Sequence, residues 1–91
     1  MSKKAVQISV KGKVQGVGYR YFAQKSAENS NVKGFVKNMP DGSVFIEAEG
    51  EEKDVDTFID YCKAGPNWAR VTDIVVNDSA ISNYSGFEVR Y

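Results

Sequence analysis

Histidine is absent from the 91 residues of this chain. Histidine is the commonest general base near neutral pH and the commonest metal ligand, so any chemistry here must proceed without it. Cysteine occurs once, at position 62, and a lone cysteine cannot form a disulfide within the chain. Because no cluster of potential ligands has the spacing of a metal site, we expect no metal and no cofactor.

The chain also lacks net charge, since 12 Lys and Arg balance 12 Asp and Glu. Nucleic-acid-binding domains usually carry a basic patch, so we expect no nucleic-acid partner. No stretch approaches the roughly 18 apolar residues that span a bilayer, and residues 1–4 precede no apolar signal-peptide segment. We therefore expect a cytoplasmic protein without a membrane partner. Its length predicts a single domain over residues 1–91, with a monomer as the default.

Apolar residues recur at two different periods along the chain. Alternation of apolar and polar residues predicts strands over 6–10, 32–38, 44–49, 70–77 and 87–91. Helical spacing predicts helices over 19–27, ending near Asn31, and over 55–62. Residues 39–42 have strong turn chemistry, Gly50 is expected to end the third strand, and Gly65–Pro66 is expected to end the second helix.

The resulting order, β-α-β-β-α-β plus a terminal strand, predicts an α+β, ferredoxin-like fold with two helices on one face of an antiparallel sheet. The crossover helix makes the first and second strands parallel, with the third strand between them. The loop after the first strand and Asn38, which ends the second, should then share one rim, two strand spacings or about 10 Å apart. Groups from both could reach one small ligand.

The glycine-rich segment 12–20, Gly-Lys-Val-Gln-Gly-Val-Gly-Tyr-Arg, joins the first strand to the first helix. Gly16 and Gly18 allow the loop to turn successive N–H groups inward as an anion-binding nest. The helix N-terminus adds unpaired N–H groups, and the planar guanidinium of Arg20 matches two phosphate oxygens. The Walker and dinucleotide-binding patterns are both absent. From the glycine spacing alone, a tight connection without a ligand remains an alternative.

Segment 12–20 resembles the first signature of the acylphosphatase family. The family's second signature is resembled by segment 34–38, Gly-Phe-Val-Lys-Asn, together with Gly42, Val44 and Gly50. The likeness extends through 65–66 and 86–91. It covers nearly the whole chain. The resemblance implies a metal-free hydrolase that cleaves the carboxyl–phosphate bond of a small-molecule acyl phosphate.

The same resemblance implies roles for particular residues. Arg20 would bind the substrate phosphate and Asn38 would orient the attacking water. The phosphate-binding backbone N–H groups would be those of Gln15, Gly16, Val17, Gly18, Tyr19 and Arg20. Two departures leave the substrate preference open: Tyr19 stands where phenylalanine is common in the family, and Trp68 stands where small residues are usual.

Two other functions remain open from the residues alone. A phosphate-binding module without catalysis would share the loop, and Asn38 is the residue that distinguishes it from an enzyme. RNA-recognition domains share the strand order, and segment 33–36 faintly resembles their aromatic motif, but paired stacking aromatics are missing.

Cys62 is expected in the core. Glu47 and Glu49 are expected to be solvated on the outer face of the third strand.

Overall fold

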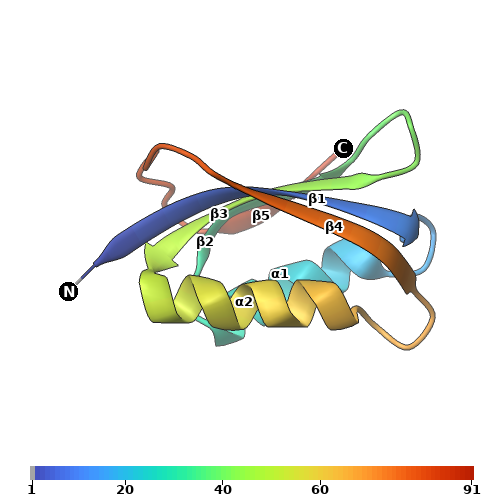
Figure 1. The fold of residues 1–91 in the computed structure, drawn as a ribbon, viewed down its shortest axis with the longest axis horizontal. Coiled ribbons are helices and arrows are strands. Elements are labelled where there is room, and N and C mark those ends of the chain that lie inside the picture. Colours follow the sequence, from blue (N-terminus) through green and yellow to red (C-terminus); the bar gives the residue numbers. More distant parts are fainter. Residues whose placement is uncertain (1) are drawn as a thin grey trace.

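Within residues 2–91, which the computed structural model describes, two helices and five strands follow the predicted order (Figure 1). The helices are α1 (Tyr19–Asn29) and α2 (Glu52–Ala64), and the strands are β1 (Lys3–Lys13), β2 (Lys33–Asn38), β3 (Val44–Glu51), β4 (Arg70–Asp78) and β5 (Phe87–Arg90). No helix in this part of the chain is long and apolar enough to cross a membrane.

The strands form one sheet in the order β4-β1-β3-β2-β5. All neighbours are antiparallel except β2 and β5, which are parallel. Both helices cover the same face of the sheet (Figure 1). Because β1 and β2 both run antiparallel to β3, they run parallel to each other on either side of it, as predicted. The ferredoxin-like prediction is therefore confirmed, and the ends of β1 and β2 meet at one rim.

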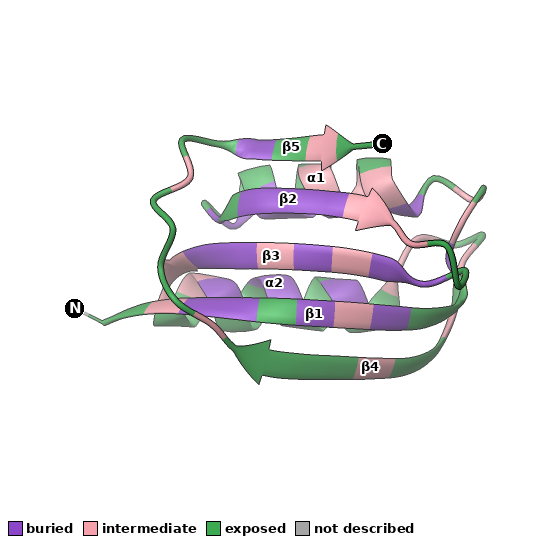
Figure 2. Cartoon of the chain, turned by 90° about the horizontal axis from the view of Figure 1, so that it is seen from above, coloured by how far each residue is buried: buried purple, intermediate pink, exposed green. Residues whose placement is uncertain are grey.

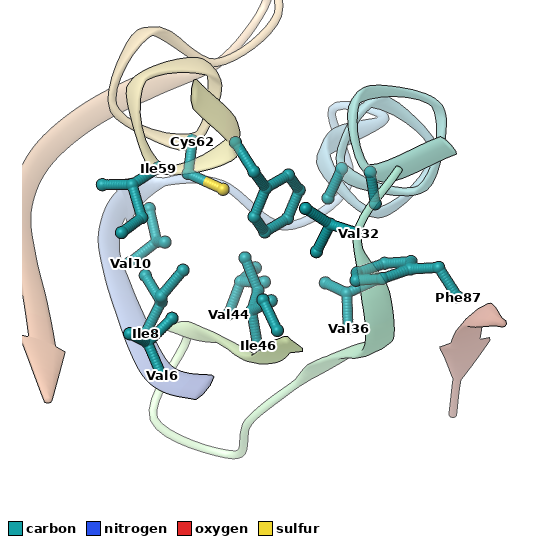
Figure 3. Packing of buried hydrophobic residues seen from close by; sticks show 14 of the residues in the cluster. Val6, Ile8, Val10, Val32, Val36, Val44, Ile46, Ile59, Cys62 and Phe87 are labelled. Carbon is teal, nitrogen blue, oxygen red and sulfur yellow. The ribbon is translucent and has the colours of Figure 1, made fainter. Parts of the chain in front are cut away.

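The core lies between the sheet and the two helices. It includes the side chains labelled in Figure 3, which are Val6, Ile8, Val10, Val32, Val36, Val44, Ile46, Ile59, Cys62 and Phe87. Strand residues enter it at every second position because side chains alternate between the faces of a sheet. Cys62 is only 1% exposed, which confirms its predicted place in the core. The Phe58 ring of α2 packs edge-on against the Phe87 ring of β5, with centroids 5.7 Å apart.

Some element boundaries differ from those predicted. Strand β3 does not end at Gly50, because β1 begins at Lys3 and supplies pairing partners for both Gly50 and Glu51. Helix α1 ends at Asn29, and Asn31 adopts a left-handed conformation with φ of 59° two residues later. Strands β1, β3 and β4 are thus longer than their apolar alternation indicates, since pairing extends into their polar ends, whereas β2 and β5 are each one residue shorter than predicted.

The prediction that Glu49 is solvated is wrong. Only 7% of Glu49 is exposed, and its carboxylate accepts hydrogen bonds from the backbone N–H groups of Ser82 (2.7 Å) and Tyr84 (2.9 Å). Glu47 is half-buried and accepts a hydrogen bond from the Tyr84 hydroxyl. The segment between β4 and β5 therefore folds against this part of the outer face. Strand β4 remains largely exposed (Figure 2).

Candidate active site

The loop between β1 and α1 has the backbone conformation that its glycines predict. Gly16 and Gly18 have φ values of 73° and 80°, in the region that favours glycine. Gly18 is also the N-cap of α1, so no side chain caps this end of the helix, and the first turn holds no acidic residue. The first N–H groups of α1 are consequently available to an anion, which the positive end of the helix dipole also favours.

The loop is anchored to the core by Tyr19. Its ring is only 1% exposed, and its hydroxyl donates a hydrogen bond of 2.7 Å to the carbonyl of Cys62 in the last turn of α2. Such carbonyls lack a partner within their own helix, so this bond satisfies one of them.

Burial raises the pKa of the Cys62 thiol to about 12. The thiol is therefore protonated at neutral pH and is no nucleophile.

Arg20 lies in the first turn of α1 and reaches toward the end of β5. One guanidinium nitrogen makes a long hydrogen bond, 3.4 Å, to the carbonyl of Arg90. The guanidinium carbon lies 4.5 Å from the centre of the Tyr91 ring, a cation–π arrangement. No carboxylate within residues 2–91 forms a salt bridge with Arg20. Its positive charge is therefore not neutralised by a protein partner.

Asn38 is the last residue of β2 and faces Val44 across the β2–β3 ladder. Its side-chain oxygen Oδ1 is buried and has no hydrogen-bond partner. Leaving such an acceptor unpaired costs about 1–3 kcal/mol, so the oxygen is a ready acceptor for water or a ligand. The following turn is closed by Asp41, which accepts hydrogen bonds from the backbone N–H and hydroxyl of Ser43.

Arg20 and Asn38 line one cavity of about 470 Å³. The lining residues are Val14, Gly16, Gly18, Tyr19, Arg20, Tyr21, Gln24, Asn38, Phe87, Glu88, Val89 and Tyr91. This volume is typical of a small-molecule site. Of the predicted phosphate-binding residues, Gln15 and Val17 are not among those that line it. Within residues 2–91, no group of three or more His, Cys, Asp and Glu residues is arranged to hold a metal ion.

Sequence reasoning missed two features of this site. The side-chain amide of Gln15 donates hydrogen bonds of 2.8 Å to the carbonyls of both Met39 and Ser43. No periodicity or motif indicates where a loop glutamine points, so the sequence carries no signal for this contact. The segment after Gly86 forms one wall of the cavity, and its apolar alternation predicted the strand but not its position beside α1.

Comparisons with a family model and with individual known proteins all indicate the same family. The family model described as acylphosphatase matches residues 6–89. The acylphosphatase of Archaeoglobus fulgidus is 48% identical over 87 residues, covering 96% of this chain and 98% of the relative. The acylphosphatase of Thermotoga maritima is 46% identical over 88 residues, covering 97% and 98%.

A solved structure agrees with these relatives in fold as well as in sequence. The crystal structure of the acylphosphatase from Bacillus subtilis superposes with a TM-score of 0.93 at 41% identity, covering 96% of this chain and 98% of that one. The chain therefore belongs to the acylphosphatase family and is a hydrolase of that kind.

Proposed function

We propose that residues 1–91 form one catalytic domain that cleaves the carboxyl–phosphate bond of an acyl phosphate, using Arg20 and Asn38. The observation that carries this proposal is the shared cavity: it is lined both by an arginine without a carboxylate partner and by an asparagine whose buried amide oxygen is unpaired. Positive charge can hold a phosphate there, and the amide can hold a water beside it. An anion-binding module without catalysis has no need for the second group.

The phosphoryl group binds to the loop after β1. The backbone N–H groups of residues 15–20 surround it as a nest, and the guanidinium of Arg20 contacts two of its oxygens. The left-handed conformations of Gly16 and Gly18, and the uncapped start of α1, support this assignment. These groups also stabilise the charge that spreads over the equatorial oxygens during phosphoryl transfer.

Asn38 orients the nucleophile. Its unpaired Oδ1 accepts a hydrogen bond from the attacking water, whose oxygen then forms a new bond to phosphorus as the bond to the acyl oxygen breaks. The acyl group departs as a carboxylate, a good leaving group that needs no general acid. The proton lost by the water passes to an oxygen of the substrate phosphate, so the step requires no histidine.

The acyl group lies along the remaining wall of the cavity. The volume of about 470 Å³ is larger than a phosphoryl group alone requires, and part of the wall is aromatic or apolar. Tyr21 belongs to α1, while Val89 and Tyr91 belong to β5 and the residue after it. The groove between these two elements can therefore hold the part of the substrate that departs.

Two variants test this proposal. In Asn38→Ala, kcat for acetyl phosphate should fall by about 100-fold or more while the inhibition constant of inorganic phosphate changes less than about twofold, because the lost contact acts only in the transition state. In Arg20→Gln, phosphate affinity and kcat should both fall, kcat by about 100- to 1000-fold. Circular dichroism melting checks that both variants fold.

Two results would contradict the proposal. Wild-type turnover in Asn38→Ala would remove the water-orienting role and favour the non-catalytic phosphate-binding module. Wild-type activity is also measured with and without a chelator, and activity that disappears in chelator and returns with a divalent ion would contradict a mechanism without metal.

A further inference from the structure

Gln15 belongs to the proposed phosphate loop, yet its side chain contacts the turn that follows β2. Both of its 2.8 Å hydrogen bonds come from the same nitrogen, Nε2, and end on the carbonyls of Met39 and Ser43. A primary amide has two N–H donors, so both are used. One side chain thus joins the loop after β1 to the turn between β2 and β3.

The turn does not need Gln15 in order to form. The N–H of Met39 donates to the carbonyl of Ser43 at 2.9 Å, and the N–H of Gly42 donates to the carbonyl of Met39 at 3.1 Å. Asp41 closes the turn further through its two hydrogen bonds with Ser43. Each carbonyl that Gln15 contacts therefore already has a backbone donor. What the Gln15 side chain adds is a fixed position of the turn relative to the loop.

No other hydrogen bond within residues 2–91 joins loop 14–18 to turn 39–43. Strand β3 lies between β1 and β2, so no ladder of backbone hydrogen bonds connects the two segments directly. Gly16, which follows Gln15, lines the cavity, and so does Asn38, which precedes Met39. The side chain of Gln15 therefore spans the gap beside the two proposed functional groups.

We propose that Gln15 is a positioning residue for hydrolysis: its side-chain amide sets the distance between the loop-bound phosphate and the water held by Asn38. This inference rests on the proposed function. In-line attack requires the water oxygen, phosphorus and leaving oxygen to be aligned, and a displacement of about 1 Å can lower the rate about 100-fold. The amide acts through the turn and through Asn38.

The first test is Gln15→Met, which keeps the length of the side chain and removes both donors. We expect kcat for acetyl phosphate to fall about 10- to 100-fold. The inhibition constant of inorganic phosphate should change less than about twofold, because the backbone N–H groups and Arg20 remain. Gln7→Met is the matched control, since Gln7 is exposed on β1 and its side-chain amide donates a hydrogen bond only to the Glu47 carboxylate. The control should keep wild-type kcat.

The same substitution in an Asn38→Ala background separates positioning from other roles. With the amide of residue 38 removed, Gln15→Met should lower kcat by less than about twofold further, because no positioned water is left to misalign. An equal loss in both backgrounds would overturn the inference, as would a phosphate affinity that falls together with kcat. Wild-type turnover in Asn38→Ala alone would instead refute the proposed function, so the two failures are distinguishable.

Gln15→Glu provides a second variant with its own signature. An ionised carboxylate has no donor and faces two carbonyl oxygens, whereas the protonated acid donates one hydrogen bond. Relative to the wild type at the same pH, kcat should recover as the pH is lowered from about 8 to about 5, while relative phosphate affinity stays constant. Absence of this recovery would overturn the inference.

Discussion

Tyr21 shows how one exposed side chain can shape the substrate preference. Although 64% of its surface is exposed, Tyr21 lines the same cavity as Arg20, the residue before it. Across the groove are Val89 and Tyr91. A tyrosine ring offers a large, rigid contact surface, so it gains more from an aromatic acyl group than from a methyl group. At the scale of single residues, the proposed mechanism therefore assigns the chemistry and the substrate preference to different side chains.

We predict that Tyr21→Ala lowers the ratio of kcat/KM for benzoyl phosphate to that for acetyl phosphate. The expected loss is about 1 kcal/mol of aromatic contact, or about fivefold in the ratio. The matched control is Tyr61→Ala, because Tyr61 is a tyrosine on α2 that is 45% exposed and does not line the cavity. An unchanged ratio in Tyr21→Ala, or an equal change in both variants, would show that the acyl group does not contact this wall.

Strand β2 carries Asn38 to the rim, and its register depends on a close approach at Gly34. A Cβ atom at position 34 would lie 1.8 Å from the carbonyl oxygen of Glu47 on β3, and the φ angle of 146° is unfavourable for any other residue. Gly34 pairs with Ala48 in the ladder between the two strands. At the scale of elements, the absence of a side chain here lets β2 pair closely with β3.

We predict that Gly34→Ala lowers the free energy of unfolding by about 3 kcal/mol or more, because β2 must separate from β3 to accommodate the methyl group. For a domain of this size, that corresponds to a fall in Tm of more than about 12 °C. Gly86→Ala is the control, since its Cβ would meet no atom within 4 Å, and it should change stability by less than about 1 kcal/mol. Similar melting temperatures for the two variants would contradict the close-packing argument.

The elements with strong periodicity could be predicted from the sequence, and the contacts made by polar loops could not. Alternation in β1 and β3 and the apolar stripe of α2 determine which faces are buried, so the fold class followed from them. Glu49 also obeys that alternation, but its burial depends on the segment after β4 folding over the outer face. That long-range contact has no periodic pattern in the sequence.

The candidate site likewise contains features that the sequence could predict and features that it could not. The glycines and Arg20 could be identified because a loop with positive φ angles and a guanidinium have recognisable residue types. Placing Asn38 at the same rim required only the strand order. The hydrogen bonds of Gln15 and the wall contributed by Tyr91 depend on three-dimensional packing, and residue type alone does not specify them.

The pH dependence of stability belongs to the whole molecule. With no histidine, the chain has no side chain whose ordinary pKa lies between about 5 and 8. The hydrogen bonds from Ser43 hold the pKa of Asp41 below its usual value of 3.8. A lowered pKa contributes stability above the unfolded value and loses it as the pH falls. Burial raises the pKa of Cys62 from 9.0 to about 12, so its contribution is lost as the pH rises through that interval.

We therefore predict a flat Tm between about pH 5 and 8, with a decline below about pH 4 and another above about pH 9. Thermal melts at constant ionic strength, followed by circular dichroism, measure the profile. Asp41→Asn keeps an acceptor for Ser43 but does not titrate, so its acid decline should be shallower than that of the wild type. A Tm that changes steeply between pH 5 and 8 would contradict this account.

The positions of β4 and β5 affect how the enzyme is made. They are consecutive in the chain but lie at opposite edges of the sheet, and segment 79–86 runs between them, held by Glu49. Val89 and Tyr91 then complete one wall of the cavity. A ribosome synthesises the proposed phosphate loop and both proposed catalytic side chains before this wall. On the nascent chain, the cavity stays open on one side until β5 has emerged and paired with β2, so we expect substrate binding only after residues 87–91 have been synthesised.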